Sequence, residues 1–178
     1  MVASQSFRDF EHAGWIDNSV ALSYHRKLGE VTRACIPPLL EAADLKTGDR
    51  ILDVACGGGY VAAAARDRGA DAVGVDFSAA QVRLAEQSYP RIRFIEGDAE
   101  DLPFTDAEFD VVFNAFGLPH VPNPDVATAE AYWVLKPGGR FVYATWSEAA
   151  KCEAAIFLAR SQRRSRWSDG RRACRCRG

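Results

Sequence analysis

The feature that most constrains the fold of this chain is an alternation of apolar, strand-like segments with helix-like segments that starts at Arg50. Its clearest part, ILDVACGGGYVAAAARDRGADAVGVDFS at residues 51–78, predicts a strand, a glycine-rich turn, a helix and a second strand that ends in an acid. Such alternation favours parallel strands joined by right-handed helical crossovers, with helices on both faces of the sheet.

The segments downstream repeat this pattern. Strands are predicted at 50–55, 70–76, 91–98, 109–116 and 140–146, and helices at 60–68, 78–88 and 122–135. Ser78 and Gln81 form an S-x-x-Q capping pattern, Asn123 is placed to cap the last helix, and KPGG at 136–139 is expected to end it. The predicted fold class is α/β: Rossmann-like and doubly wound, with a mainly parallel sheet. Ligands of such sheets bind beyond the carboxyl ends of the strands.

Three regions are expected: an N-terminal helical cap at 1–49, an α/β core at 50–147, and a segment at 148–178 that starts as a helix and continues as an Arg-rich, disordered tail. In the cap, one helix is predicted to start near Asn18. A second should bury one face, made of Ile36, Leu39, Leu40 and Ala43. Pro37 and Pro38 should bend that helix or lie in its first turn.

Charge divides the chain in two. Residues 160–178 contain eight Arg and one Asp, a net charge of +7, and because the whole chain carries 22 basic and 24 acidic residues the remainder has −9. An acidic core argues against specific nucleic-acid binding. No apolar run approaches the ~20 residues that span a bilayer, and the N-terminus lacks a signal-peptide core. We therefore expect a cytoplasmic protein that does not enter membranes, with its five cysteines as free thiols.

The glycine-rich turn is compatible with two kinds of ligand. Gly57, Gly59 and Ala62 satisfy G-x-G-x-x-A, and Asp76 follows Gly57 by nineteen residues, both as in a dinucleotide-binding fingerprint. However, Asp53 lies four residues before the first glycine, where a carboxylate would repel a pyrophosphate and suit an ammonium group. Acids in EGDAEDLPF, at the end of the third strand, can accept a hydrogen bond from an adenine amino group.

Five motifs in order, LDVACGGG, VGVDFS, EGDAEDLPF, FDVVFNAFGLPH and VLKPGGRF, resemble those of the class I S-adenosylmethionine-dependent methyltransferases. The subgroup typified by ubiquinone and menaquinone C-methyltransferases is the most similar, over residues 15–146. The resemblance implies S-adenosyl-L-methionine as cofactor and a small-molecule methyl acceptor. No metal is expected, because the leaving group is already a neutral thioether.

The resemblance also implies residues that bind the cofactor. Gly57 and Gly59 would let the backbone approach the methionine portion, next to Ala55. Asp53 would attract the cationic amino-acid end, and Asp76 would accept hydrogen bonds from both ribose hydroxyls. The alternatives are that Asp53 only caps N–H groups of the turn and that Asp76 is a plain loop acid.

At the adenine end, the resemblance implies that Phe77 packs on the ring, Asp98 accepts from its amino group and the N–H of Ala99 donates to a ring nitrogen. Asn114 and Ala115 would line the methionine moiety near the methyl group. Phe77 as a core residue and Asp98 as a turn residue are the alternatives that the sequence leaves open.

His120, in the loop after the fourth strand, is the candidate general base, with a structural or substrate-lining role as the alternative. Trp15, Tyr24 and His25 can form part of a lid over the cofactor or simply pack. Cys56 is expected only to fit the turn.

The resemblance stops after the fifth strand. Family members usually continue with two strands that form an antiparallel pair, whereas the residues after Trp146 do not match, so the chain resembles a truncated or frame-shifted relative. Strand five would then be a sheet edge, and an apolar edge such as RFVYATW favours self-association or an unstable fragment. Besides an active methyltransferase, two alternatives stay open: a paralogue that only binds the cofactor, and an NAD-dependent oxidoreductase domain.

Overall fold

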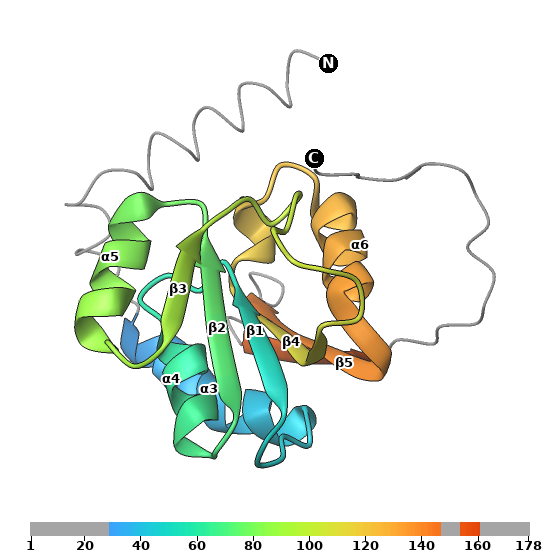
Figure 1. The fold of residues 1–178 in the computed structure, drawn as a ribbon, viewed down its shortest axis with the longest axis horizontal. Helices are drawn as coiled ribbons and strands as arrows, with labels where there is room; N and C mark the ends of the chain where they lie inside the picture. Colours follow the sequence, from blue (N-terminus) through green and yellow to red (C-terminus); the bar gives the residue numbers. More distant parts are fainter. Residues whose placement is uncertain (1–28, 147–153, 161–178) are drawn as a thin grey trace.

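The computed structural model describes residues 29–146 and the backbone of 154–160. These residues form a six-stranded sheet in the order β3-β2-β1-β4-β5-β6 (Figure 1). The strands β1 to β5 are parallel, and β6 runs antiparallel to β5. The expected Rossmann-like α/β class is confirmed. The strands are β1 (Arg50–Val54), β2 (Asp71–Asp76), β3 (Arg93–Glu96), β4 (Phe109–Ala115), β5 (Leu135–Trp146) and β6 (Ala154–Arg160).

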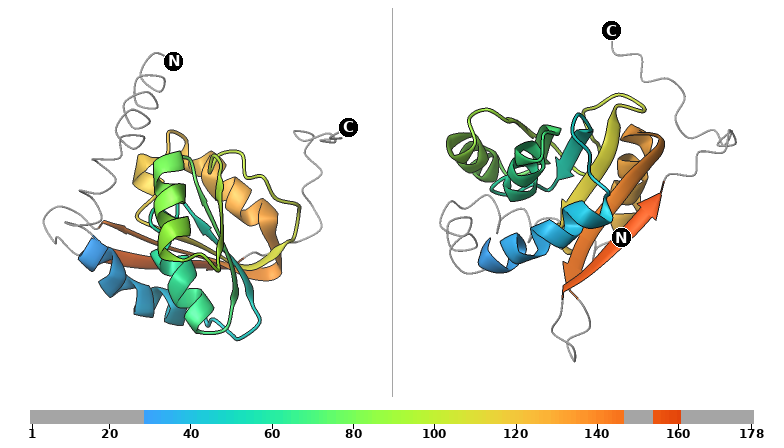
Figure 2. Two further views of the ribbon diagram at one scale, coloured as in Figure 1. Left: turned by 60° about the vertical axis from the view of Figure 1, so that its left-hand side comes forward. Right: turned by 90° about the horizontal axis from the view of Figure 1, so that it is seen from below.

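Helices cover both faces of the sheet (Figure 2). Side chains alternate along the strands, so Ile51 and Phe113 contact the helices of one face, whereas Leu52 and Val112 contact the helix of the other. Burial on both faces explains why the central strands are continuous apolar runs. None of the described helices is both long and apolar enough to cross a membrane. The first face carries α3 (Gly29–Ala42), α4 (Tyr60–Asp67) and α5 (Ala79–Ser88), and the second carries α6 (Pro124–Val134).

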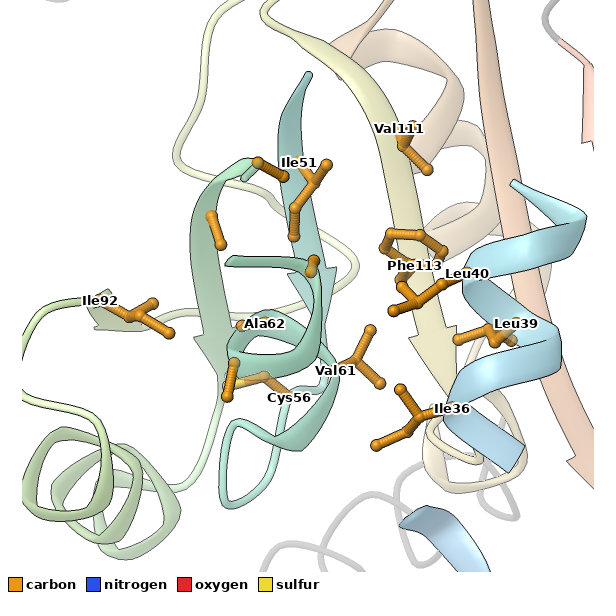
Figure 3. Packing of buried hydrophobic residues seen from close by; sticks show 14 of the residues in the cluster. Ile36, Leu39, Leu40, Ile51, Cys56, Val61, Ala62, Ile92, Val111 and Phe113 are labelled. Atoms are coloured by element: carbon orange, nitrogen blue, oxygen red, sulfur yellow. The ribbon is translucent and has the colours of Figure 1, made fainter. Parts of the chain in front are cut away.

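The helix α3 packs on the sheet through the face that the sequence predicted. Ile36, Leu39, Leu40 and Ala43 are all buried, and Figure 3 shows Leu40 beside Phe113 and Ile36 near Val61. Pro37 and Pro38 lie in the interior of the helix rather than in its first turn. Both are exposed, so the pyrrolidine rings do not interrupt the packed face.

One expectation for the C-terminal part is wrong. The backbone of 154–160 forms β6, which pairs with β5 from Arg140 to Trp146, whereas the helix expected to start at 148 falls outside the described residues. An antiparallel strand is therefore present, and β5 is not a sheet edge, because its backbone groups find partners on β6. The argument for self-association through β5 no longer holds. The Arg-rich tail itself lies outside the described residues.

The start of β5 also differs from the prediction. The strand begins at Leu135, directly after α6, so KPGG lies within β5 rather than in a turn before it. The pairing between β4 and β5 shifts register here, between Phe109 and Val111. The glycines and the proline therefore mark an irregular strand start.

Ion pairs hold the amino ends of the strands, at the edge of the sheet opposite the predicted site. Arg50 lies 2.7 Å from Glu108, and Lys136 lies 2.7 Å from Asp110. Burial raises the pKa of Asp110, but hydrogen bonds from Lys136 and from the Arg50 N–H outweigh burial and leave that pKa below its ordinary value. Charges at this edge are thus matched within the chain.

Candidate functional site

The carboxyl ends of the central strands open onto a cavity of about 560 Å³. This is the edge at which doubly wound sheets bind ligands. The structure brings together predicted site residues that are up to 67 positions apart in the sequence, and only Gly59 and Asn114 lie outside the lining. Those that line the cavity are Asp53, Ala55, Gly57, Asp76, Phe77, Asp98, Ala99, Ala115 and His120.

Asp53, near the end of β1, is almost completely buried. Its Oδ2 accepts a hydrogen bond from the N–H of Ala62 at 3.1 Å, one of the donors that the first turn of a helix leaves without a helical partner. Asp53 thus performs the capping role, since the N-cap residue Gly59 has no side chain. Burial raises the pKa of Asp53 to about 7; the Ala62 N–H opposes this shift, and the charge of Asp76 adds to it.

Asp76, at the end of β2, is held by backbone donors on both oxygens. Its Oδ2 accepts from the N–H of Gly57 at 2.8 Å, and its Oδ1 accepts from the N–H of Ser78 at 2.9 Å. Burial raises the pKa of Asp76 to about 6, against the lowering effect of these two N–H groups. The carboxylate is therefore fixed against the glycine turn, and each oxygen keeps a further lone pair for a ligand.

The two carboxylates lack a positive partner in the described part of the chain. Neither Asp53 nor Asp76 forms an ion pair with Lys or Arg there, in contrast to the acids at the opposite edge of the sheet. Burying two negative charges without a cation is unfavourable. A positively charged ligand in the cavity would remove that penalty.

The two predicted glycines serve different purposes. Gly57 lines the cavity, and a Cβ added there would meet nothing closer than Gln81 Oε1, at 3.9 Å. A Cβ on Gly59 would lie 2.6 Å from the ring of Phe94, so this glycine is needed for packing of α4 on the sheet. Ala55, just before them, has a φ of 54°, which is a strained conformation for alanine.

The loop after β3 contributes Asp98 and Ala99 to the lining of the cavity, and Phe77, after the end of β2, lines it as well. Asp98 Oδ1 accepts from the N–H of Glu100 at 2.9 Å, so it forms the turn that the alternative anticipated. Phe77 is partly exposed and faces the cavity rather than the core.

Asn114 is buried beneath the cavity instead of lining it. Its Nδ2 donates to the carbonyl of Val54 at 3.0 Å, and its Oδ1 accepts from the N–H groups of Gly117 and Leu118 at 3.1 and 2.9 Å. The side chain thus ties the end of β1 to the loop after β4. Its neighbour Ala115 does line the cavity.

His120 ends the short helix η1 (Leu118–His120) and lines the cavity from the loop after β4. It is half-buried, which suits a group that exchanges a proton with a ligand. The lid hypothesis concerns Trp15, Tyr24 and His25, which lie outside the described residues.

The lining also includes residues that the sequence did not assign to a ligand, among them Thr32, Tyr60, Gln81 and Phe116. Tyr60 follows the glycine turn and Phe116 follows Ala115, so their positions beside strand ends could have indicated them. Phe116 is also buried with a φ of 63°, and its ring lies 4.5 Å from that of Trp146. Strained residues often occur at functional sites. Thr32 left no signal, because only the packing of α3 brings it to the cavity.

The residues present fit a cationic amino-acid nucleoside. Asp53 and Asp76 can accept hydrogen bonds from an ammonium group and from sugar hydroxyls. Gly57 leaves space for close approach of a ligand to the backbone, and Phe77 offers an aromatic face. The fold and the cavity together are those of a Rossmann-like domain whose cavity can accommodate a nucleoside.

A family model described as a methyltransferase domain matches residues 52–143, which is more than half of the chain. The chain therefore belongs to the class I S-adenosylmethionine-dependent methyltransferases, as its motifs predicted. The family also favours S-adenosylmethionine over the dinucleotide that the glycine pattern left open.

Relatives and solved structures agree with this assignment. Demethylmenaquinone methyltransferases of Paenarthrobacter aurescens and Renibacterium salmoninarum are 41% and 42% identical to the chain over 109 residues, which are 61% of this chain and 43% and 46% of theirs. The chain thus spans less than half the length of these relatives. A phosphoethanolamine N-methyltransferase 2 of Haemonchus contortus, solved with phosphomonomethylethanolamine and S-adenosylhomocysteine, superposes with a TM-score of 0.68 at 26% identity, over 82% of this chain and 38% of its own.

Proposed function

We propose that the chain transfers a methyl group from S-adenosyl-L-methionine to a small, apolar acceptor. The observation that supports this most strongly is the pair of buried carboxylates, Asp53 and Asp76, which line the cavity without a Lys or Arg partner among the described residues. A ligand that carries a sulfonium and an ammonium group offsets their charge. A pyrophosphate would add negative charge to the same space, which argues against the NAD alternative.

Each end of the cavity has a defined task in this proposal. When bound, S-adenosylmethionine supplies a methyl group attached to a positively charged sulfur, and this sulfur becomes a neutral thioether once the methyl group is transferred. Asp53 and Gly57 hold the amino-acid end, Asp76 holds the ribose hydroxyls, and Phe77 and Asp98 hold the adenine. The chain then contributes alignment and exclusion of water, which are worth about 7–11 kcal/mol in well-oriented reactions.

The acceptor side of the cavity is mainly apolar. Ala115, Phe116, Val121 and Pro122 line it, and such a surface favours an uncharged, apolar acceptor. The relatives named demethylmenaquinone methyltransferases support this choice, because a quinone is a molecule of this kind. His120 lies among these residues and takes a proton if the acceptor must lose one during transfer.

Calorimetric titration and a transfer assay test the proposal. We expect S-adenosylmethionine and S-adenosylhomocysteine to bind and NAD not to bind, with labelled methyl transferred to a reduced, short-chain demethylmenaquinone analogue. Cofactor binding with no transfer to this or any other apolar acceptor would support the paralogue that only binds the cofactor. Binding of NAD alone would overturn the proposal.

Two variants of acidic residues on β2 test whether binding depends on the carboxylate at the cavity or on any acidic side chain of the strand. Asp76→Ala should weaken S-adenosylhomocysteine binding by about 1.5–3 kcal/mol, the range for losing a hydrogen bond to a charged group. Asp71→Ala is the matched control, since Asp71 is exposed at the other end of the same strand. Equal affinities of the two variants would remove the ribose assignment.

His120→Gln decides between a base and a lining residue. If His120 is a base, the variant should show a large fall in kcat and a changed pH–rate profile, with an unchanged affinity for S-adenosylhomocysteine. An unchanged kcat assigns His120 to the lining of the cavity.

A further inference from the structure

Two acidic residues join the loop after β3 to the helix α6. Glu100 of the loop accepts two hydrogen bonds from Asn123, at Oε1 from its backbone N–H at 3.1 Å and at Oε2 from its side-chain amide at 2.8 Å. Glu130 of the helix accepts a hydrogen bond at Oε2 from the N–H of Leu102 at 3.1 Å. An acid of each element thus binds the other element, and the loop and the helix are fixed to each other at two points.

The two contacts differ in burial. Glu130 is 3% exposed and Leu102 is 5% exposed, so their contact belongs to the core of this face of the sheet. Glu100 is only half-buried, and Asn123 is exposed. If Glu100 is replaced, water can reach the N–H groups that it leaves without a partner. Packing of the core therefore does not explain the contact between Glu100 and Asn123.

Capping of α6 by its own residues does not explain this contact either. Asn123 is the N-cap residue, but its side chain makes no capping hydrogen bond. In a capping box, a Glu in the first turn of the helix would accept from the N-cap N–H. Here Glu100 accepts from that N–H, although it belongs to a different element. The start of α6 is therefore held by a side chain of the loop after β3.

The contact joins two parts of the cavity wall. The two residues before Glu100 line the cavity, and so do the two residues before Asn123. The first pair lies on the side assigned above to the adenine, and the second pair lies on the side assigned to the acceptor. The four residues are Asp98, Ala99, Val121 and Pro122.

We propose that Glu100 is a positioning residue that fixes the acceptor side of the cavity, through Asn123, to the loop that receives the adenine. Cofactor binding then orders the acceptor side as well. Because coupling between two binding sites is reciprocal, a bound acceptor strengthens cofactor binding by the same factor. This inference rests on the proposed use of S-adenosylmethionine.

Hydrogen exchange measured by mass spectrometry tests the inference on segments 97–103 and 117–123. Without ligand, Glu100→Ala should raise the exchange rate of 117–123 about tenfold, the size expected for a charge-assisted hydrogen bond at a half-buried position. S-adenosylhomocysteine should protect both segments in the wild type and only 97–103 in the variant. Asp125→Ala, which removes an exposed acid from the first turn of α6, is the control and should behave like the wild type.

A transfer assay separates positioning from a general loss of stability. With the reduced, short-chain demethylmenaquinone analogue, Glu100→Ala should raise KM for the acceptor about tenfold and leave kcat and the affinity for S-adenosylhomocysteine within about twofold of the wild type. A variant that is only less stable would lower kcat, because less protein is folded, and leave KM unchanged. That result would contradict a positioning role.

Three results of the exchange experiment would overturn the inference. Wild-type exchange of 117–123 in Glu100→Ala means that the contact does not hold this segment. Equal protection of 117–123 by the ligand in both proteins means that the ligand acts on it by another route. Protection of only 97–103 in the wild type means that the two segments are independent.

Failure of the proposed function gives a different result. A wild type that does not bind S-adenosylhomocysteine removes that function and the coupling with it, while the comparison without ligand still shows whether Glu100 holds the acceptor side. If Glu100→Ala does not fold, Glu100→Gln replaces it. This variant keeps one acceptor oxygen, so its exchange rate without ligand should rise by a smaller factor.

Discussion

Replacing Asp53 by Asn should make the protein without ligand more stable above neutral pH and, at the same time, weaken cofactor binding. Asn has the shape of Asp, and its Oδ1 can still accept the hydrogen bond from the Ala62 N–H. The substitution therefore removes the buried charge and little else. A residue that lowers stability but favours binding is expected at a functional site, where the two requirements compete.

The size of the effect follows from the pKa of Asp53. Burial raises this pKa from 3.8 to about 7, so the folded protein binds a proton that the unfolded chain releases between these two pH values. A raised carboxyl pKa means that stability is lost as the pH rises from about 4 to 7. At 1.36 kcal/mol per pKa unit, the loss reaches about 4 kcal/mol above pH 7, as an upper bound.

Urea unfolding of the wild type and of Asp53→Asn at several pH values measures this difference. The variant should be the more stable protein at pH 8, and its advantage should shrink by about 2–3 kcal/mol on lowering the pH to 5, because Asp53 then becomes protonated. Asp76 titrates in both proteins, so its contribution to the pH dependence of stability largely cancels in the comparison. Asp71→Asn, at the exposed end of β2, should show no such dependence.

The binding half of the prediction is measured by calorimetry at pH 8. Asp53→Asn should bind S-adenosylmethionine more weakly than the wild type, because a cationic ligand loses the opposite charge. A variant that is no more stable than the wild type at pH 8, or whose advantage does not change with pH, would show that Asp53 is not desolvated and would falsify the reasoning.

The remaining predictions concern the turn and its support. Gly57→Ala should fold with a loss of about 1 kcal/mol of stability for its left-handed φ and should weaken S-adenosylhomocysteine binding. Gly59→Ala should lose about 2–4 kcal/mol of stability through contact with Phe94. Thermal unfolding and titration distinguish the two variants, and identical behaviour would contradict the assignment of Gly57 to the ligand and of Gly59 to packing. Asn114→Ala leaves three backbone groups without their partner and should cost about 2–4 kcal/mol in urea unfolding; a loss below about 0.5 kcal/mol would mean that water replaces the side chain.

Local sequence patterns were sufficient to predict much of the fold of this protein. The alternation of strands and helices after Arg50 predicted the parallel sheet, because side-chain periodicity and turn residues act within a few positions. Asp53, Gly57 and Asp76 could be assigned to the cavity because the carboxyl ends of parallel strands meet at one edge. Their roles toward a ligand still rest on the proposed function.

The features that the sequence did not predict depend on contacts between residues far apart in the chain. No local signal shows that Gly59 faces Phe94, that Asn114 lies beneath the cavity, or that the N–H of Ser78 donates to Asp76. The pairing of β6 with β5 was missed for the same reason, since it depends on backbone groups of both strands and not on the composition of either. The sequence alone determined the class of fold and the edge of the sheet at which the cavity lies. Only the tertiary structure determined which side chains line the cavity and which hold the turn, because that depends on the three-dimensional space around each residue.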